Sequence, residues 1–174
     1  RTLDPLRRIQ ALEVSDPIKG SLHLQNYTFA GGRLKTIQSG DVSFEYQYLP
    51  QSSLLAGVHS IHQPSGASWI QARTYSTLNQ LTEMRTTGSR GEMWNFQYTY
   101  NLANQRTRLE REDGSYWSYQ YDFQGQITGG AKFEPDGQAI PGFSLNYQFD
   151  AIGNRTSTER PPETSVPYVS NALN

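Results

Sequence analysis

The titratable side chains whose spacing could support chemistry fall in two short segments. His59 and His62 stand three residues apart, and two imidazoles at that spacing on a helix could bind a metal ion. Glu110, Glu112 and Asp113 form the densest carboxylate cluster, and paired carboxylates can act as general acid and general base. The histidines, however, lie between strand patterns with no acidic residue or cysteine nearby, so we expect ordinary loop histidines. The carboxylates alternate with arginines before an Asp-Gly turn, which predicts a solvated hairpin tip.

Two glycine pairs, Gly31–Gly32 and Gly129–Gly130, lack the context of a phosphate-binding loop, because neither opens a helix with GxGxxG or GxxxxGKS/T spacing. We expect turns or bulges there. No nucleophile-elbow motif is present, although the members of a catalytic triad meet in space and not in sequence. We therefore expect no catalytic residue, no cofactor and no bound metal. An enzyme with a site between hairpins stays open as the least favoured of three functional hypotheses, after a structural role and a binding role.

Aromatic rings are the one feature open to a binding role, since exposed Tyr and Trp can stack on sugars. The candidate ligand-stacking residues are Trp69, Trp94, Trp117, Tyr119 and Tyr147. Burial of these rings in the wall of a sheet is the interpretation we prefer.

The elements that must position these residues are four runs in which aromatic or apolar residues alternate strictly with polar ones. The runs are Phe44–Tyr48, Phe96–Tyr100, Trp117–Tyr121 and Leu145–Phe149. A period of two places the rings on one face and the polar side chains on the other, which predicts half-buried β-strands. A Gly or Asn four residues past the last aromatic residue supplies the positive φ of a tight turn. Asp122 and Asp150 directly follow such residues, where a carboxylate can accept hydrogen bonds from the backbone of the turn.

The last aromatic position of each run can be taken as an anchor that repeats along the chain in steps of 21 to 28 residues. The anchors are Leu3, Tyr27, Tyr48, Tyr75, Tyr100, Tyr121, Phe149 and Ser170, of which the first and last are degenerate and not aromatic. Repeats of this period indicate an array, so residues 1–174 are predicted to be one array of β-hairpins. Asp4-Pro5 could equally cap a short helix, but the register favours a hairpin. The Pro-rich segment 161–167 lacks alternation and is expected to be a surface loop.

The eight repeats of two strands predict about 16 strands, which at roughly 4.8 Å each make a sheet about 75 Å wide. Twisted sheets of that width do not stay flat, so we expect an all-β fold with a coiled or spiralling sheet. Arg1 falls two residues before an anchor, Asn174 falls at a turn position, and neither end has a polar capping unit. We therefore expect the chain to be a slice of a larger protein.

Composition narrows the classes of partner. The 174 residues carry 15 basic and 16 acidic side chains in no block of like charge, which disfavours nucleic acid and anionic membrane surfaces as partners. No cysteine is present, which excludes disulfides and thiolate chemistry. No apolar stretch approaches the roughly 18 residues of a membrane span, so we expect no direct membrane insertion.

The segments 121–128 (YDFQGQIT) and 149–156 (FDAIGNRT) resemble the YD repeat of Rhs proteins, bacterial toxin complexes and teneurins, with a consensus close to YDxxGxL/R-x. The resemblance covers nearly the whole chain. Tyr27, Tyr75 and Tyr100 lack the following Asp, and the repeat at Tyr48 lacks both Asp and Gly. The resemblance implies a long β-sheet that spirals into a hollow shell, often around a toxic polypeptide. We find no counterpart of the self-cleaving aspartyl element that closes some of these shells.

We therefore expect a non-catalytic structural segment of a large exported or surface-displayed bacterial protein. Its partners would be the rest of its own polypeptide and an enclosed or presented passenger domain, and its location would be secreted or cell-surface, as the resemblance implies. The alternative is a module that binds a glycan or a protein through its aromatic face. Fold alone is a weak guide to function, so these expectations need the geometry of the side chains.

Overall fold

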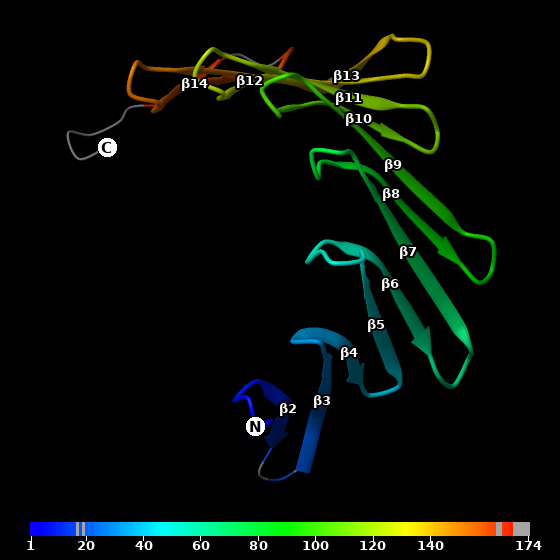
Figure 1. Ribbon diagram of the computed structural model, residues 1–174. Helices are drawn as coiled ribbons and strands as arrows, with labels where there is room; N and C mark the ends of the chain where they lie inside the picture. The colour runs from blue at the N-terminus through cyan, green and yellow to red at the C-terminus, as the bar shows by residue number, and fades with distance from the viewer. Residues whose placement is uncertain (17, 19, 163–164, 169–174) are drawn as a thin grey trace. The chain divides into compact units, whose positions relative to one another are not determined.

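The computed structural model describes residues 1–16, 18, 20–162 and 165–168. Over these residues the chain is all-β, and fifteen strands join in one sheet in which each strand pairs with the next along the chain (Figure 1). The pairing is antiparallel wherever the register is defined, from β1 with β2 to β14 with β15. This confirms the predicted all-β class and the tandem hairpin order. Alternating aromatic and polar residues between Gly, Asn and Asp turns favour this arrangement.

The strands are β1 (Thr2–Leu3), β2 (Ile9–Asp16), β3 (Gly20–Ala30), β4 (Arg33–Ser39), β5 (Val42–Tyr48), β6 (Leu55–His62), β7 (Ala67–Tyr75), β8 (Leu81–Gly88), β9 (Met93–Tyr100), β10 (Arg106–Arg111), β11 (Tyr116–Tyr121), β12 (Ile127–Phe133), β13 (Ala139–Phe149), β14 (Arg155–Glu159) and β15 (Val166–Pro167). The chain divides into two compact units, which we describe separately. The first unit comprises Arg1–Thr74 and Met84–Trp94, and the second comprises Tyr75–Glu83 and Asn95–Asn174.

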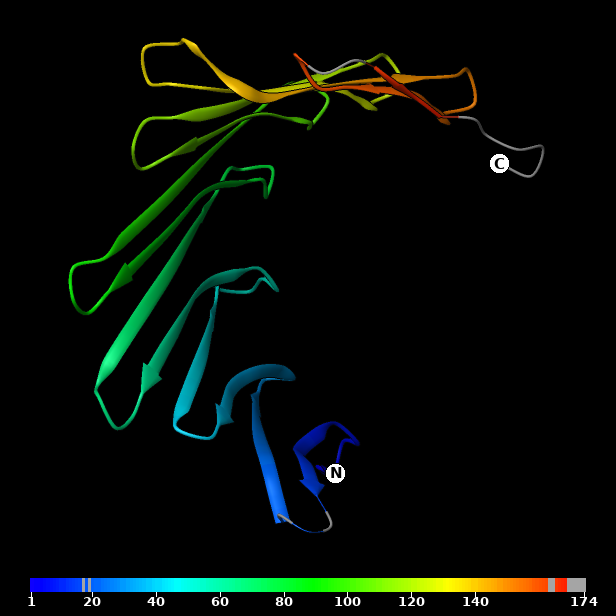
Figure 2. The same ribbon diagram turned by 180° about the vertical axis from the view of Figure 1, so that it is seen from behind.

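Each unit is a single layer. Within a unit, the strands that contact one another are neighbours in the chain, and the front and back views show no second layer of strands from the same unit (Figures 1 and 2). Among the described residues no hydrophobic side chain is fully buried. The alternation predicted for the faces is confirmed. In β9, for example, Phe96, Tyr98 and Tyr100 are partly buried while Gln97 and Thr99 are exposed. Packing between neighbouring rings on one face therefore replaces a two-layer core.

Six of the eight anchors end a strand. They are Leu3, Tyr48, Tyr75, Tyr100, Tyr121 and Phe149. Four residues after five of these anchors, the backbone has a positive φ of 61° to 90°, at Arg7, Asn79, Asn104, Gly125 and Gly153. The turn after Tyr48 is built differently, with its positive φ at Gln51. The last anchor, Ser170, lies outside the described residues.

The N-terminal hairpin is confirmed, because β1 pairs with β2 and Asp4 lies in the turn between them. The turn after Tyr27 differs from the predicted form. Strand β3 continues past Tyr27 to Ala30, and Gly31–Gly32 make a two-residue turn with both φ angles positive. Glycine at both central positions permits this tighter hairpin, which has the right-handed twist of the flanking strands.

Three local predictions need correction. His59 and His62 are not loop residues, because both lie in β6 and pair with β5 and β7. Gly129–Gly130 are not in a turn, because both lie inside β12, although the register with β11 shifts next to them. The predicted loop 161–167 is shorter than expected, since Val166–Pro167 form β15 against β14. In each case pairing with neighbouring strands decides the structure, and local sequence signals do not report it.

Candidate binding surfaces

The carboxylates that follow the anchors hold the turns, as predicted. Asp122 Oδ1 accepts hydrogen bonds from the backbone N–H of Gln124 and Gln126, both at 2.9 Å. Asp150 Oδ1 accepts the equivalent bonds from Ile152 at 3.0 Å and Asn154 at 2.8 Å. The backbone N–H of Asn154 is the main reason that the pKa of Asp150 lies below its usual value. Both carboxylates are therefore engaged in hydrogen bonds with the backbone of their own turns.

Other residue types fill the same role where the Asp is missing. Ser76 Oγ accepts bonds from the N–H groups of Leu78 and Gln80, and Asn101 Oδ1 accepts them from Ala103 and Gln105. What the position requires is a short side chain with an oxygen acceptor, because the acceptor must reach two amides within its own turn.

Three anchor tyrosines, Tyr48, Tyr100 and Tyr121, bind the backbone of the preceding hairpin through their hydroxyls. Tyr100 donates to the Leu81 carbonyl at 2.8 Å, and Tyr121 donates to the Arg106 carbonyl at 2.7 Å. Leu81 is the first residue of β8, which follows the anchor Tyr75. Arg106 is the first residue of β10, which follows the anchor Tyr100. A ring packed on the sheet with its hydroxyl paired suits a wall with one wet side.

Arginines lie over aromatic rings in both units, and none of these arginines is among the site residues predicted from the sequence. In the second unit, the guanidinium of Arg106 is 4.3 Å from the centre of the Tyr98 ring, and that of Arg155 is 4.3 Å from the centre of the Tyr147 ring. In the first unit, Arg8 lies over Phe29 at 4.1 Å and Arg33 over Tyr48 at 5.3 Å. Each contact is a cation–π interaction.

One sequence signal could have found three of these arginines. Arg33, Arg106 and Arg155 each stand six residues past an anchor, at Tyr27, Tyr100 and Phe149 respectively. Strand geometry alone does not say which ring each of them covers, because that depends on the cross-strand register.

The aromatic face of the second unit has a cluster around β11. The Trp117 and Tyr119 rings are nearly parallel, with centres 6.4 Å apart, and the Phe143 ring meets Trp117 edge-on at 6.2 Å. Lys132 lies 5.4 Å from the centre of the Phe143 ring. Burial raises the pKa of Tyr119, and the nearby Arg106 charge offsets part of that effect.

The first unit has its own aromatic pair. The Trp69 and Trp94 rings have centres 5.0 Å apart at an angle of 40°, and each residue is more than one third exposed. A side chain at Gly88 would overlap the Trp69 ring, so this glycine makes room for the pair. Trp69 also lines an open hollow of about 370 Å³ with Phe44, Tyr46 and Arg73 among its neighbours.

The structure therefore distributes the five candidate ligand-stacking residues over three places. Trp69 and Trp94 pair with each other in the first unit, Trp117 and Tyr119 stack in β11, and Tyr147 lies under Arg155. The guanidinium covers one side of the Tyr147 ring.

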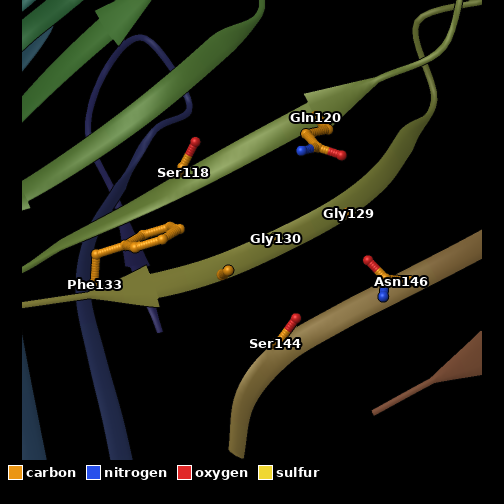
Figure 3. A pocket seen from close by; sticks show the side chains of 8 residues that line it. Ser118, Gln120, Gly129, Gly130, Phe133, Ser144 and Asn146 are labelled. Carbon is orange, nitrogen blue, oxygen red and sulfur yellow. The ribbon is translucent and has the colours of Figure 1, made fainter. Parts of the chain in front are cut away.

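A polar hollow lies on the opposite face of the second unit. Its volume is about 130 Å³, and its lining residues are Ser118, Gln120, Gly129, Gly130, Ala131, Phe133, Ser144 and Asn146. Figure 3 shows Ser118 and Gln120 on one flanking strand and Ser144 and Asn146 on the other, with the Gly129–Gly130 strand between them. A Cβ at Gly129 would stand 3.2 Å from Asn146 Oδ1 and 3.5 Å from Gln120 Oε1. The missing side chains on β12 thus create the hollow, whose amides and hydroxyls can exchange hydrogen bonds but do not titrate near neutral pH.

The histidine and carboxylate clusters do not converge. His59 and His62 are three residues apart in one strand and so point to opposite faces, and His62 Nδ1 is 2.7 Å from Ser65 Oγ. Glu110 lies in β10 and pairs with Arg108 at 2.8 Å, so it is not part of the predicted tip. Asp113 is in the turn, where bonds from the Ser115 hydroxyl and backbone N–H hold its pKa below the usual value.

No group of three metal-ligating side chains occurs in the part of the chain that the structure describes. Within those same residues, no helix is long and apolar enough to cross a membrane.

Comparison with known proteins finds no family model that matches the chain and no matching curated protein. Among solved structures, the crystal structures of TcdB2-TccC3-Cdc42 and of TcdB2-TccC3 without its hypervariable C-terminal region are similar to it. Each shares 13% sequence identity with the chain and covers 88% of it, with a TM-score of 0.49. The chain spans only 12% and 11% of the length of those two chains.

Proposed function

We propose that this chain is a non-catalytic structural segment of a larger exported or cell-surface bacterial protein of the YD-repeat type. In that protein it would form part of a β-shell that encloses or presents a passenger toxin domain. One observation carries the proposal: within each single-layer unit the aromatic face is only partly buried by its own side chains, and no other described strand of the same unit covers it. Such a face is suited to meet something outside the repeats.

The construction of the sheet supports a role as a wall. The anchor tyrosines Tyr48, Tyr100 and Tyr121 each bond to the backbone of the preceding hairpin, so these repeats are joined by side chains as well as by the strand ladder. The turn carboxylates, which are the most regularly placed acidic groups, are occupied by backbone amides and are not available as acid–base catalysts. The YDFQGQIT and FDAIGNRT phrases, which resemble YD repeats, lie in the same turns.

Site-specific photocrosslinking in the natural full-length polypeptide tests the proposal. A photoreactive phenylalanine would replace Tyr119 on the aromatic face, and in a second protein it would replace Gln120, the next residue in β11, on the opposite face. We expect crosslinks from position 119 to sequence outside the repeats, and few from position 120. The measurement is mass spectrometry of the crosslinked peptides together with the intact mass.

Two results would count against the shell role. One is an intact natural polypeptide no larger than this chain, because it would leave no passenger to enclose. The other is equal crosslinking to non-repeat sequence from both faces, because a wall distinguishes its inside from its outside.

A further inference from the structure

The two faces of the second unit differ in charge. Residues paired across an antiparallel ladder point to the same face, so the register assigns each charged side chain of β9–β14 from Asn95 to Glu159. The aromatic face carries four cations and no strand carboxylate: Arg106, Arg111, Lys132 and Arg155. The opposite face carries one cation and two carboxylates: Arg108, Glu110 and Glu159. The near-zero net charge of the whole chain conceals this separation.

Arg106 and Arg155 are each positioned by an aromatic ring and can bind an anionic group. Each guanidinium is 4.3 Å from the centre of a tyrosine ring, Tyr98 or Tyr147, and each residue is exposed. Neither forms an ion pair with a carboxylate among the described residues, although Arg155 also lies 6.0 Å from the centre of the Tyr168 ring and hydrogen-bonds the hydroxyl of that residue. Stacking orients the planar guanidinium, and its N–H donors at the edge match the two oxygens of a carboxylate.

Arg108, in the same strand as Arg106, is an arginine whose charge is paired with a carboxylate. It too lies over a ring, that of Tyr116 at 3.5 Å, but it is bound to Glu110 Oε2 at 2.8 Å. The carboxylate partner that Arg108 has on its face is missing for Arg106 on the other.

The surroundings of Arg106 favour a partner that is partly apolar. Arg106 lines an open hollow of about 450 Å³ together with Tyr100, Tyr119, Tyr121 and Ile127. Phenol and aliphatic surfaces beside the cation exclude water on one side and strengthen its attraction for an anion. The carboxylate of Asp122, which follows the anchor Tyr121, already accepts two backbone hydrogen bonds of its own turn.

The ring faces on this surface are already in contact with other side chains, which argues against single-stranded nucleic acid as the ligand. Such a ligand needs open ring faces on which bases can stack. Here Arg106 and Arg155 cover Tyr98 and Tyr147, and Trp117 is packed against Tyr119 and Phe143. Cations separated by apolar rings match a polypeptide in which acidic and apolar side chains alternate.

We propose that the aromatic face of β9–β14 is a docking surface for an acidic segment of polypeptide, with Arg106 and Arg155 as its carboxylate-binding residues. This goes beyond the shell role and does not depend on it, because the surface belongs to one unit of this chain.

The test is fluorescence anisotropy with the full 174-residue chain and a labelled synthetic peptide of alternating glutamate and leucine. The comparison probes are the same peptide with lysine for glutamate, and oligothymidylate. We expect the glutamate peptide to bind most tightly and to weaken as salt is added. The double variant Arg106→Gln/Arg155→Gln should lose about threefold to fivefold in affinity for each arginine, since each removed charge pair is partly exposed to solvent.

Arg108→Gln is the matched control, because Arg108 lies in the same strand on the opposite face, and its affinity should change by less than about twofold. If the glutamine variants fold poorly by circular dichroism, Arg106→Lys/Arg155→Lys keeps the charges but loses the planar fork, and it should also weaken binding. The proposal is overturned if lysine peptide or oligothymidylate binds as tightly as glutamate peptide, or if Arg108→Gln weakens binding as much as the double variant.

Discussion

At the scale of single residues, a short acceptor side chain directly after the anchor holds the turn that follows. Asp122, Asp150, Asn101 and Ser76 all accept bonds from two amides of their own turn, although one is a hydroxyl and one an amide. Charge is therefore not required at this position, while an oxygen at the right reach is. The position directly after the anchor can therefore vary between Asp, Asn and Ser from repeat to repeat, because each of these side chains can accept the hydrogen bonds of the turn.

Substitution of Asp122 tests that interpretation. We expect Asp122→Ala to lower the local stability of the turn by about 1 kcal/mol, because the N–H groups of Gln124 and Gln126 lose their acceptor. Asp122→Asn should retain most of the stability, as Asn101 does in its own turn. Hydrogen exchange at the two amides measures the difference, and equal loss in both variants would show that charge is what matters.

The turns should also differ in their response to acid. The pKa values of Asp113 and Asp150 are lowered in the folded chain from the usual 3.8. A lowered pKa adds stability above the unfolded value, and that stability is lost as the pH falls below 3.8 towards the folded pKa. The turn at Ser76 has no titrating acceptor and serves as the internal control.

Amide chemical shifts followed by NMR through this pH range check the prediction. The amide shifts of Ser115 and Asn154 should move as protonation removes the charge of their acceptors and weakens these hydrogen bonds, while that of Gln80 should not. Parallel changes at all three amides would instead indicate global unfolding by acid.

At the scale of the strand, glycines inside the sheet meet different structural requirements. A Cβ at Gly57 would come within 2.5 Å of the Gln71 backbone oxygen on the paired strand. A Cβ at Gly129 would meet the flexible amide tips of Asn146 and Gln120 at 3.2 and 3.5 Å. The first glycine allows two backbones to approach, and the second leaves a hollow in the surface.

These two positions therefore predict opposite outcomes for one substitution. Gly57→Ala should destabilise its strands by about 1 to 3 kcal/mol, because the backbone must move apart. Gly129→Ala should change stability by no more than about 0.5 kcal/mol, since side-chain tips can rotate away. Urea unfolding of the two variants, followed by tryptophan fluorescence, gives the comparison. A similar loss in both would mean that the close approach at Gly57 is not limiting.

At the scale of the whole chain, stability is spread along the array. No described hydrophobic side chain is fully buried, and within a unit each strand contacts only its sequence neighbours. Folding of such a protein is a sum of repeat terms and nearest-neighbour terms, and not one cooperative core. Regions far apart in sequence should therefore open independently.

Leu109→Ala tests this independence. Leu109 pairs with Tyr98 and with Trp117 on the aromatic face, so its loss should speed hydrogen exchange in β9, β10 and β11. Exchange in β4, β5 and β6 should remain as in the parent chain. Hydrogen exchange with mass spectrometry maps both regions in one experiment, and a uniform increase would show a cooperative unit larger than the hairpin.

The sequence by itself determined the strands, the turns and the two-faced pattern, because these depend on neighbouring residues. Alternation in Phe96–Tyr100 predicts a half-buried strand, and Asp122 with Gly125 predicts a particular turn, without knowledge of any distant residue. The tertiary structure decided what depends on cross-strand register. That register brings Arg106 over Tyr98, carries the Tyr121 hydroxyl to Arg106 O and leaves Gly129 beside Asn146. A shift of one residue would move each of these side chains to the other face, so local sequence could not specify the charged aromatic surface.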